Sequence, residues 1–222
     1  MSPRLPLNIL VNRRCQCRCP FCVEDTVDGV NGDIDTERCI DIINTLYTAD
    51  KVESILLLGG KPLLHPGLIK IIQSMPIPPI ITTNGMILSK NKEILRQIIE
   101  SPIRTVNVSI HHYKQEQNAK LMGSGYSFDG LKDAIKGLKS KGISVRMNTL
   151  LIKGYIDNLE EIEKMVDFAK WLNMDEVKFG ELTAYNPDIH DFIKVKVLDF
   201  NNDSNPTNII LYNIISTNFV MS

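Results

Sequence analysis

Short apolar runs rich in β-branched residues recur along the chain, and they alternate with segments in which apolar residues are spaced three or four apart. Runs of the first kind, bounded by turn residues, are typical of strands. Six strands are expected, at residues 7–11, 52–58, 80–83, 105–110, 143–152 and 176–182. The second spacing predicts helices between them, at residues 36–49, 66–74, 89–100, 128–140 and 158–172.

Each connection between consecutive strands is long enough to return the chain in its original direction. The sequence therefore predicts an α/β fold with parallel strands. Six such units suit either an open doubly wound sheet or a partly closed barrel, and periodicity alone does not choose between them. Both architectures bind ligands at the carboxyl ends of the strands, so the residues that directly follow each strand are the first candidates for chemistry.

The last part of the chain has a different pattern. Residues 193–200 alternate as a strand does, residues 201–208 are rich in turn formers, and residues 208–221 are apolar enough for another strand. We therefore expect a core domain over residues 1–182 and a short C-terminal extension over residues 183–222 that packs on the sheet or closes it.

Composition narrows the class of protein. The 25 Lys and Arg residues balance 26 Asp and Glu residues, with a net charge of −1, which argues against nucleic-acid binding through a basic face. No apolar run approaches the ~20 residues of a transmembrane helix, and no signal-peptide core with a cleavage site is found. A cytoplasmic protein without membrane contact is expected. A chain of 222 residues also needs no metal or disulfide merely to fold, so its five cysteines require another explanation.

Four of the five cysteines directly follow the first expected strand. The segment reads Cys15-Gln-Cys17-Arg-Cys19-Pro-Phe-Cys22 and contains the spacing C-x3-C-x2-C. Three thiolates on one loop can bind three irons of a cubane cluster and leave the fourth iron open to another ligand, as in a reactive site. Two alternatives remain: a zinc site made by all four thiols, and a closed cluster with Cys17 as fourth ligand.

This spacing, with Phe21 before the last cysteine, resembles the signature of radical S-adenosylmethionine enzymes. The resemblance implies a partial (β/α)6 barrel similar to a TIM barrel. It also implies a 4Fe-4S cluster bound by Cys15, Cys19 and Cys22, with S-adenosylmethionine on the open iron. An electron from a flavodoxin- or ferredoxin-type donor would cleave S-adenosylmethionine to a 5'-deoxyadenosyl radical, which abstracts hydrogen from the substrate. Cys17 is then a spare thiol, and Cys39 is a buried apolar residue.

The second expected strand ends in Gly59-Gly60-Lys61-Pro62, which resembles the Gly-Gly-Glu-Pro motif that binds the cofactor's amino group in this family. Lys61 departs from that motif, because a cation beside an ammonium group repels it. In one account the backbone carbonyls suffice and Lys61 turns toward the methionine carboxylate. In the other, cofactor binding is weakened.

Three further strand ends resemble the family. Residues 81–85 resemble its Thr-Asn-Gly turn, and residues 146–154 and 177–182 resemble the corresponding runs of molybdenum-cofactor cyclase-like members. The resemblance assigns these residues to the cofactor site: Phe21, Gly59, Gly60, Lys61, Asn84, Ser109, Asn148 and Ile152.

Four residues at strand ends are candidates for the substrate side: His111, His112, Lys153 and Glu181. A histidine here could orient a substrate or move a proton. The alternatives are a helix-capping ring for one histidine, an exposed ring for the other, and a salt bridge for the lysine and the glutamate. His65, at a helix start, is expected to be structural.

These features predict a radical enzyme that abstracts hydrogen from a small molecule such as a sugar, a nucleotide or an amino acid. No second cysteine cluster follows Cys39, which argues against a member with auxiliary clusters. One alternative is a maturase or activase that acts on a peptide or protein. Another, of a different class, is a non-catalytic iron-sulfur or zinc-binding module in which Lys61 marks the loss of cofactor use.

Overall fold

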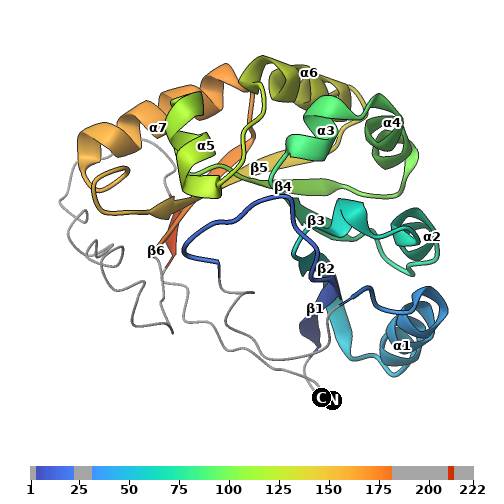
Figure 1. Cartoon of the computed structure of the whole chain (residues 1–222). Helices are drawn as coiled ribbons and strands as arrows, with labels where there is room; N and C mark the ends of the chain where they lie inside the picture. The colour runs from blue at the N-terminus through green and yellow to red at the C-terminus, as the bar shows by residue number, and fades with distance from the viewer. Residues whose placement is uncertain (1–3, 23–31, 182–209, 213–222) are drawn as a thin grey trace.

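The computed structural model describes residues 4–22, 32–181 and 210–212. In these residues, seven strands form one parallel sheet in the order of the sequence (Figure 1). The strands are β1 (Leu5–Asn12), β2 (Val52–Gly59), β3 (Ile80–Thr83), β4 (Thr105–Ser109), β5 (Ser144–Leu151), β6 (Glu176–Glu181) and β7 (Ile210–Tyr212). The six strands predicted from the sequence are confirmed to within two residues at each end.

The helices are α1 (Thr36–Thr48), α2 (Leu68–Gln73), α3 (Met86–Lys90), α4 (Lys92–Glu100), α5 (Gln115–Met122), α6 (Phe128–Lys139) and α7 (Leu159–Trp171), with a 3-10 turn, η2 (Pro62–Leu64). The single helix expected at residues 89–100 is wrong at its start. Asn91 separates α3 from α4, because its Oδ1 accepts from the N–H groups of Glu93 and Ile94 at 3.1 and 3.0 Å and so caps a new helix.

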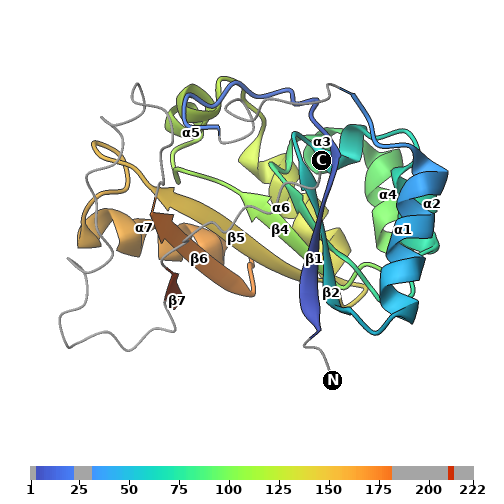
Figure 2. The same ribbon diagram turned by 90° about the horizontal axis from the view of Figure 1, so that it is seen from below.

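The described helices pack along one side of the curved sheet (Figures 1 and 2). Alternate strand residues point toward them and are fully buried, as Ile55, Leu57, Val106, Val108 and Phe179 are. This alternation follows from the two-residue repeat of side chains along a strand. The intervening residues face the other side of the sheet, where polar side chains are common.

Most of the expected C-terminal extension, residues 183–222, lies outside the described residues, and so does the strand expected at residues 193–200. The described piece is β7, which pairs in parallel with β6. Within the described part of the chain, no helix combines the length and the apolar character that crossing a membrane requires.

Candidate functional site

The cysteine loop, residues 13–22, leaves the carboxyl end of β1 and crosses the ends of the neighbouring strands toward α5 (Figure 1). Its middle is held there by the Arg18 N–H, which donates to the Met122 carbonyl at 2.9 Å. Near its start, the Arg14 guanidinium donates to both Asp33 carboxylate oxygens, at 3.1 and 2.7 Å, and to the Leu64 carbonyl at 2.6 Å. The loop is therefore fixed to three separate segments of the fold.

Cys15, Cys19 and Cys22 are exposed or half-buried, whereas Cys17 is buried. The Cys22 N–H donates to the Cys19 carbonyl at 3.0 Å, which closes a turn between these two cysteines. Cys17 points into the protein, where the Asn84 amide donates to its Sγ at 2.9 Å. The three thiols that the signature assigns to the cluster are thus accessible, and the fourth is held by the protein.

Among the described residues, no three cysteine, histidine or carboxylate groups converge as they would around a single metal ion. A cubane cluster does not require such convergence, because each cysteine binds a different iron at a different corner. Three accessible thiols on one fixed loop are a donor set of the kind that binds three irons of such a cluster.

Asn12, the last residue of β1, joins the cysteine loop to the end of β2. Its amide donates to the Lys61 carbonyl at 2.9 Å, and its Oδ1 accepts from the Lys61 N–H at 3.2 Å. Its own carbonyl accepts from the Gly60 N–H at 2.9 Å. Asn12 is 2% exposed, so these bonds lie away from water. Sequence reasoning missed this residue, although a polar side chain at the end of an apolar strand is the signal that could have found it.

The junction between Asn12 and the end of β2 requires glycine at positions 59 and 60. Gly59 has a φ of +127°, and a Cβ on it would lie 2.2 Å from the Asn12 carbonyl oxygen. A Cβ on Gly60 would lie 2.4 Å from the Arg14 carbonyl oxygen. In the sequence, the two glycines are assigned to the cofactor site by resemblance to the family motif. The structure gives them another function, which is to let the start of the cysteine loop approach β2; their contact with a cofactor stays a prediction.

Lys61 extends from this junction, half-buried, and its Nζ donates to the Gly60 carbonyl at 2.7 Å. Burial, reinforced by the Lys61 ammonium, lowers the pKa of His111 to about 4. In the metal-free protein, a hydrogen bond with Cys17 raises the pKa of the Cys15 thiol. The positive charge of Lys61 acts in the opposite direction and lowers this pKa. Lys61 therefore lies within electrostatic range of both the cysteine loop and the end of β4.

Other residues assigned to the cofactor lie near the carboxyl ends of the strands, as the cysteine loop does. Ser109 and Asn148 are adjacent across β4 and β5, and the Asn148 Oδ1 is buried with no hydrogen-bond partner among the described residues. Phe21 and Ile152 are buried together in a small apolar cluster. Asn84 is fully buried beneath the loop, where its amide donates to the Cys17 Sγ and its Oδ1 accepts from the Met86 N–H.

The two histidines after β4 are both buried. The His111 Nδ1 accepts from the Leu150 N–H at 3.3 Å, which fixes the neutral tautomer with hydrogen on Nε2, and its ring meets Phe21 edge to face at 5.1 Å. The His112 Nδ1 accepts from the N–H of Lys114, the residue that precedes α5, at 2.9 Å. His112 thus contacts the backbone of the residue before α5 without capping the helix itself, and neither ring is exposed.

His65 and the two charged candidates lie at the following places. His65 is structural, as predicted, since its Nε2 lies 2.8 Å from the Ile34 carbonyl and its Nδ1 accepts from the Gly67 N–H. Lys153 is exposed in the turn after β5, and Glu181 is half-buried at the end of β6. Both lie at the carboxyl ends of the strands, and their functions stay predictions.

A polar row crosses the face of the sheet opposite the helices. Thr82, Asn107, Arg146 and Glu176 are directly paired from β3 to β6. The Asn107 amide donates to Thr82 at 3.4 Å, and Arg146 lies 3.8 Å from Glu176. The Asn107 Oδ1 and the Arg146 Nε are buried without a hydrogen-bond partner among the described residues. Because such atoms are costly to leave unpaired, this face is suited to polar contents such as water or a ligand.

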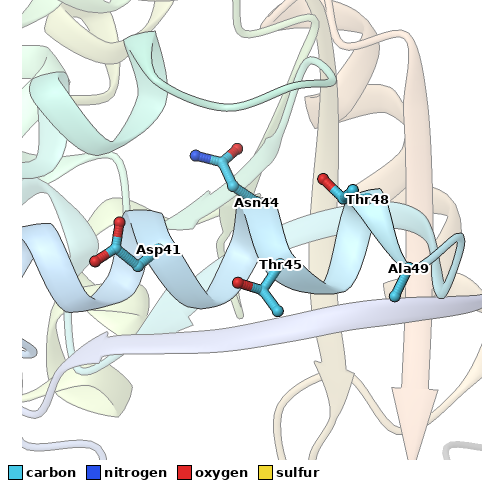
Figure 3. Close-up of a pocket in the computed structure, with 5 residues that line it drawn as sticks. All are labelled: Asp41, Asn44, Thr45, Thr48 and Ala49. Atoms are coloured by element: carbon cyan, nitrogen blue, oxygen red, sulfur yellow. The ribbon is translucent and has the colours of Figure 1, made fainter.

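A shallow pocket elsewhere is lined by Asp41, Asn44, Thr45 and Thr48 of α1 and by Ala49, which directly follows this helix (Figure 3). The Leu5 N–H donates to the Lys51 carbonyl, so the chain just beyond this pocket meets the amino end of β1. The cysteine loop begins at the other end of that strand. The pocket is therefore unrelated to the site described above.

Residues 9–169, more than half of the chain, match the Radical SAM superfamily. The chain belongs to this superfamily, whose enzymes use a 4Fe-4S cluster and S-adenosylmethionine. It is similar to GTP 3',8-cyclase from Aquifex aeolicus, with 31% identity over 78% of this chain and 55% of that protein. It is also similar to GTP 3',8-cyclase from Rhizobium etli, with 27% identity over 76% of this chain and 49% of that protein. The chain thus spans about half the length of these curated relatives.

Solved structures support the fold. SuiB from Streptococcus suis bound to the precursor peptide SuiA is 21% identical, with a TM-score of 0.67 over 87% of this chain and 42% of that one. Methylornithine synthase (PylB) is 18% identical, with a TM-score of 0.65 over 86% of this chain and 57% of that one. The partial-barrel architecture expected from the sequence is confirmed.

Proposed function

We propose that this chain is the radical-generating core of an S-adenosylmethionine enzyme that abstracts hydrogen from a small molecule, with a nucleotide as the favoured substrate class. The observation that carries the proposal is the accessible set of Cys15, Cys19 and Cys22 on a loop fixed at the carboxyl edge of the sheet. The similarity to proteins named GTP 3',8-cyclase favours a nucleotide over a sugar, an amino acid or a peptide.

The three cysteines would bind the 4Fe-4S cluster, which supplies the electron that cleaves S-adenosylmethionine when both are bound. The adenine ring would lie against the apolar cluster that contains Phe21 and Ile152, which are 5% and 0% exposed without a ligand. Ser109 and the unpartnered Oδ1 of Asn148 offer hydrogen bonds to the polar parts of the cofactor. Asn84 supports the loop from below through Cys17.

On the substrate side, neutral His111 would orient the substrate through its Nε2–H, because its other ring nitrogen already accepts from the backbone. Lys153 and Glu181 would lie at the rim. The electron would come from a flavodoxin- or ferredoxin-type protein.

Anaerobic reconstitution tests the proposal. The purified chain should take up about four irons, and after reduction with dithionite it should form 5'-deoxyadenosine from S-adenosylmethionine in the presence of a nucleotide such as GTP. The product is measured by liquid chromatography. A reduced protein with its full iron content that forms no 5'-deoxyadenosine with any nucleotide, sugar or amino acid would contradict the proposal, and zinc in place of iron would indicate a binding module.

The Lys61→Glu variant tests how Lys61 acts on the cofactor. In the first account, the backbone carbonyls bind the cofactor's ammonium while Lys61 turns from the Gly60 carbonyl to the methionine carboxylate. The Lys61→Glu substitution should then not increase the affinity for S-adenosylmethionine. The dissociation constant of S-adenosylmethionine is measured by anaerobic calorimetry on the cluster-loaded protein, with Lys61→Arg as the charge-preserving control. A gain in affinity beyond about tenfold, roughly 1.4 kcal/mol, would show instead that Lys61 weakens binding.

A further inference from the structure

The position of Lys61 bears on the electron that the cluster must accept. Its backbone is held on both sides by the Asn12 side chain, at 2.9 and 3.2 Å. Its neighbour Gly60 is fixed to the Asn12 carbonyl at 2.9 Å. Asn12 itself directly precedes the cysteine loop. The base of the lysine side chain is therefore tied to the first residues of the segment that carries the cysteines.

The side chain then folds back, with its Nζ on the Gly60 carbonyl at 2.7 Å. Gly60 in turn packs directly against the backbone of Arg13 and Arg14, because a Cβ on Gly60 would lie 2.4 Å from the Arg14 carbonyl oxygen. Arg14 directly precedes Cys15 in the chain. The ammonium is therefore held at the start of the cysteine loop, which carries the three thiols assigned to the cluster.

The charge of Lys61 is not neutralised nearby by a carboxylate. Within the described ranges, every ion pair involves another lysine or arginine, and no carboxylate oxygen lies within 4.0 Å of the Lys61 Nζ. The side chain is also half-buried, so water and salt screen its field less than they would at the surface. A cluster bound to this loop would therefore experience a positive charge that no carboxylate of the described residues neutralises.

One-electron reduction adds one negative charge to an iron-sulfur cluster. A fixed cation nearby stabilises the reduced form more than the oxidised form, and net charge and hydrogen bonding are among the factors that set cluster potentials. We propose that Lys61 is a positioning residue that raises the reduction potential of the cluster, so that this protein accepts its electron more readily than it would with a neutral or acidic residue at position 61. The inference rests on the proposed function only in requiring that Cys15, Cys19 and Cys22 bind a 4Fe-4S cluster.

The test is an anaerobic redox titration without S-adenosylmethionine, in which electron paramagnetic resonance follows the reduced cluster. Lys61→Met removes the charge and keeps an unbranched side chain of similar length. Lys61→Arg keeps the charge. Lys170→Met removes an exposed charge from α7, where Lys170 pairs with Asp167 of the same helix. The equilibrium constant for reduction should fall at least tenfold in Lys61→Met, a shift of about −59 mV, and should change by less than threefold in the other two variants.

Two failures are distinguishable in this experiment. If none of the proteins binds about four irons, the proposed function fails before Lys61 is tested. If the cluster forms in all four proteins and Lys61→Met titrates at the wild-type potential, the proposed function survives and the inference about Lys61 is overturned. An equal shift in Lys170→Met would also overturn it, because the effect would then follow net charge and not position.

Discussion

Replacing Cys19 with alanine should abolish cluster binding, whereas replacing Cys17 should not. Cys19 is half-buried near the middle of the loop, with its Sγ 3.9 Å from the Met122 carbonyl, and it closes the turn to Cys22. Its loss leaves two thiolates where the cluster needs three. Cys17 is buried and held by the Asn84 amide at 2.9 Å. Iron and acid-labile sulfide content after anaerobic reconstitution measure the difference, and the visible absorption of the cluster provides a second readout.

Cys39→Ala is a matched control, because Cys39 lies on α1 with 2% exposure and burial raises the pKa of its thiol to about 11. It should bind as much iron as the wild type. The opposite result for the main pair, with iron lost in Cys17→Ala and kept in Cys19→Ala, would overturn the assignment of Cys15, Cys19 and Cys22. Loss of iron in both variants would instead indicate that all four clustered thiols bind the metal.

The strands could be predicted from the sequence because burial on a parallel sheet leaves a local signature. Most of the strands are short runs rich in apolar residues, many of them β-branched, and the neighbours of each strand in the sheet are also its neighbours in the sequence. Helix α5 was missed because its pattern is weak. Residues 115–122 bury Asn118 together with Leu121 and Met122, so the buried side of this helix is partly polar. Its Asn118 Oδ1 accepts from the His111 N–H, a contact that only the fold reveals.

The candidate site also has one part that could be predicted from the sequence and another that only the fold reveals. The three cysteines and Phe21 lie within one loop, so their spacing could be recognised without a structure. The contacts of Asn12 with Lys61 join residues 49 positions apart, and those of Arg14 join it to Asp33 and Leu64. No local pattern predicts which distant carbonyl or carboxylate a side chain will meet. The candidate ligands could therefore be proposed from the sequence, whereas the residues that hold their loop in place could not.

The pair Gly59 and Gly60 shows that residues assigned to a cofactor by a motif can also be required by the fold. The resemblance assigned the two glycines to a cofactor, and that assignment stays a prediction. The structure shows that both approach backbone atoms of residues 12–14 more closely than any side chain would allow. A substitution at Gly59 should therefore damage the protein even when no cofactor is present, and this can be measured separately from catalysis.

Gly59→Ala should destabilise the cluster-free protein by roughly 2 to 5 kcal/mol, as the sum of left-handed backbone strain and overpacking. Its φ is +127°, and the new Cβ would lie 2.2 Å from the Asn12 carbonyl oxygen, a backbone atom held by the Gly60 N–H. Gly32→Ala is the matched control: its φ of +134° is similar, and nothing lies within 4 Å of its Cβ position.

Urea unfolding followed by circular dichroism gives the free energy of unfolding of both variants. If the junction of β1 and β2 is as tight as the structure shows, Gly59→Ala must cost more than Gly32→Ala, because only the former adds the steric clash to the strain. Equal losses would mean that the cysteine loop leaves β1 by a looser path.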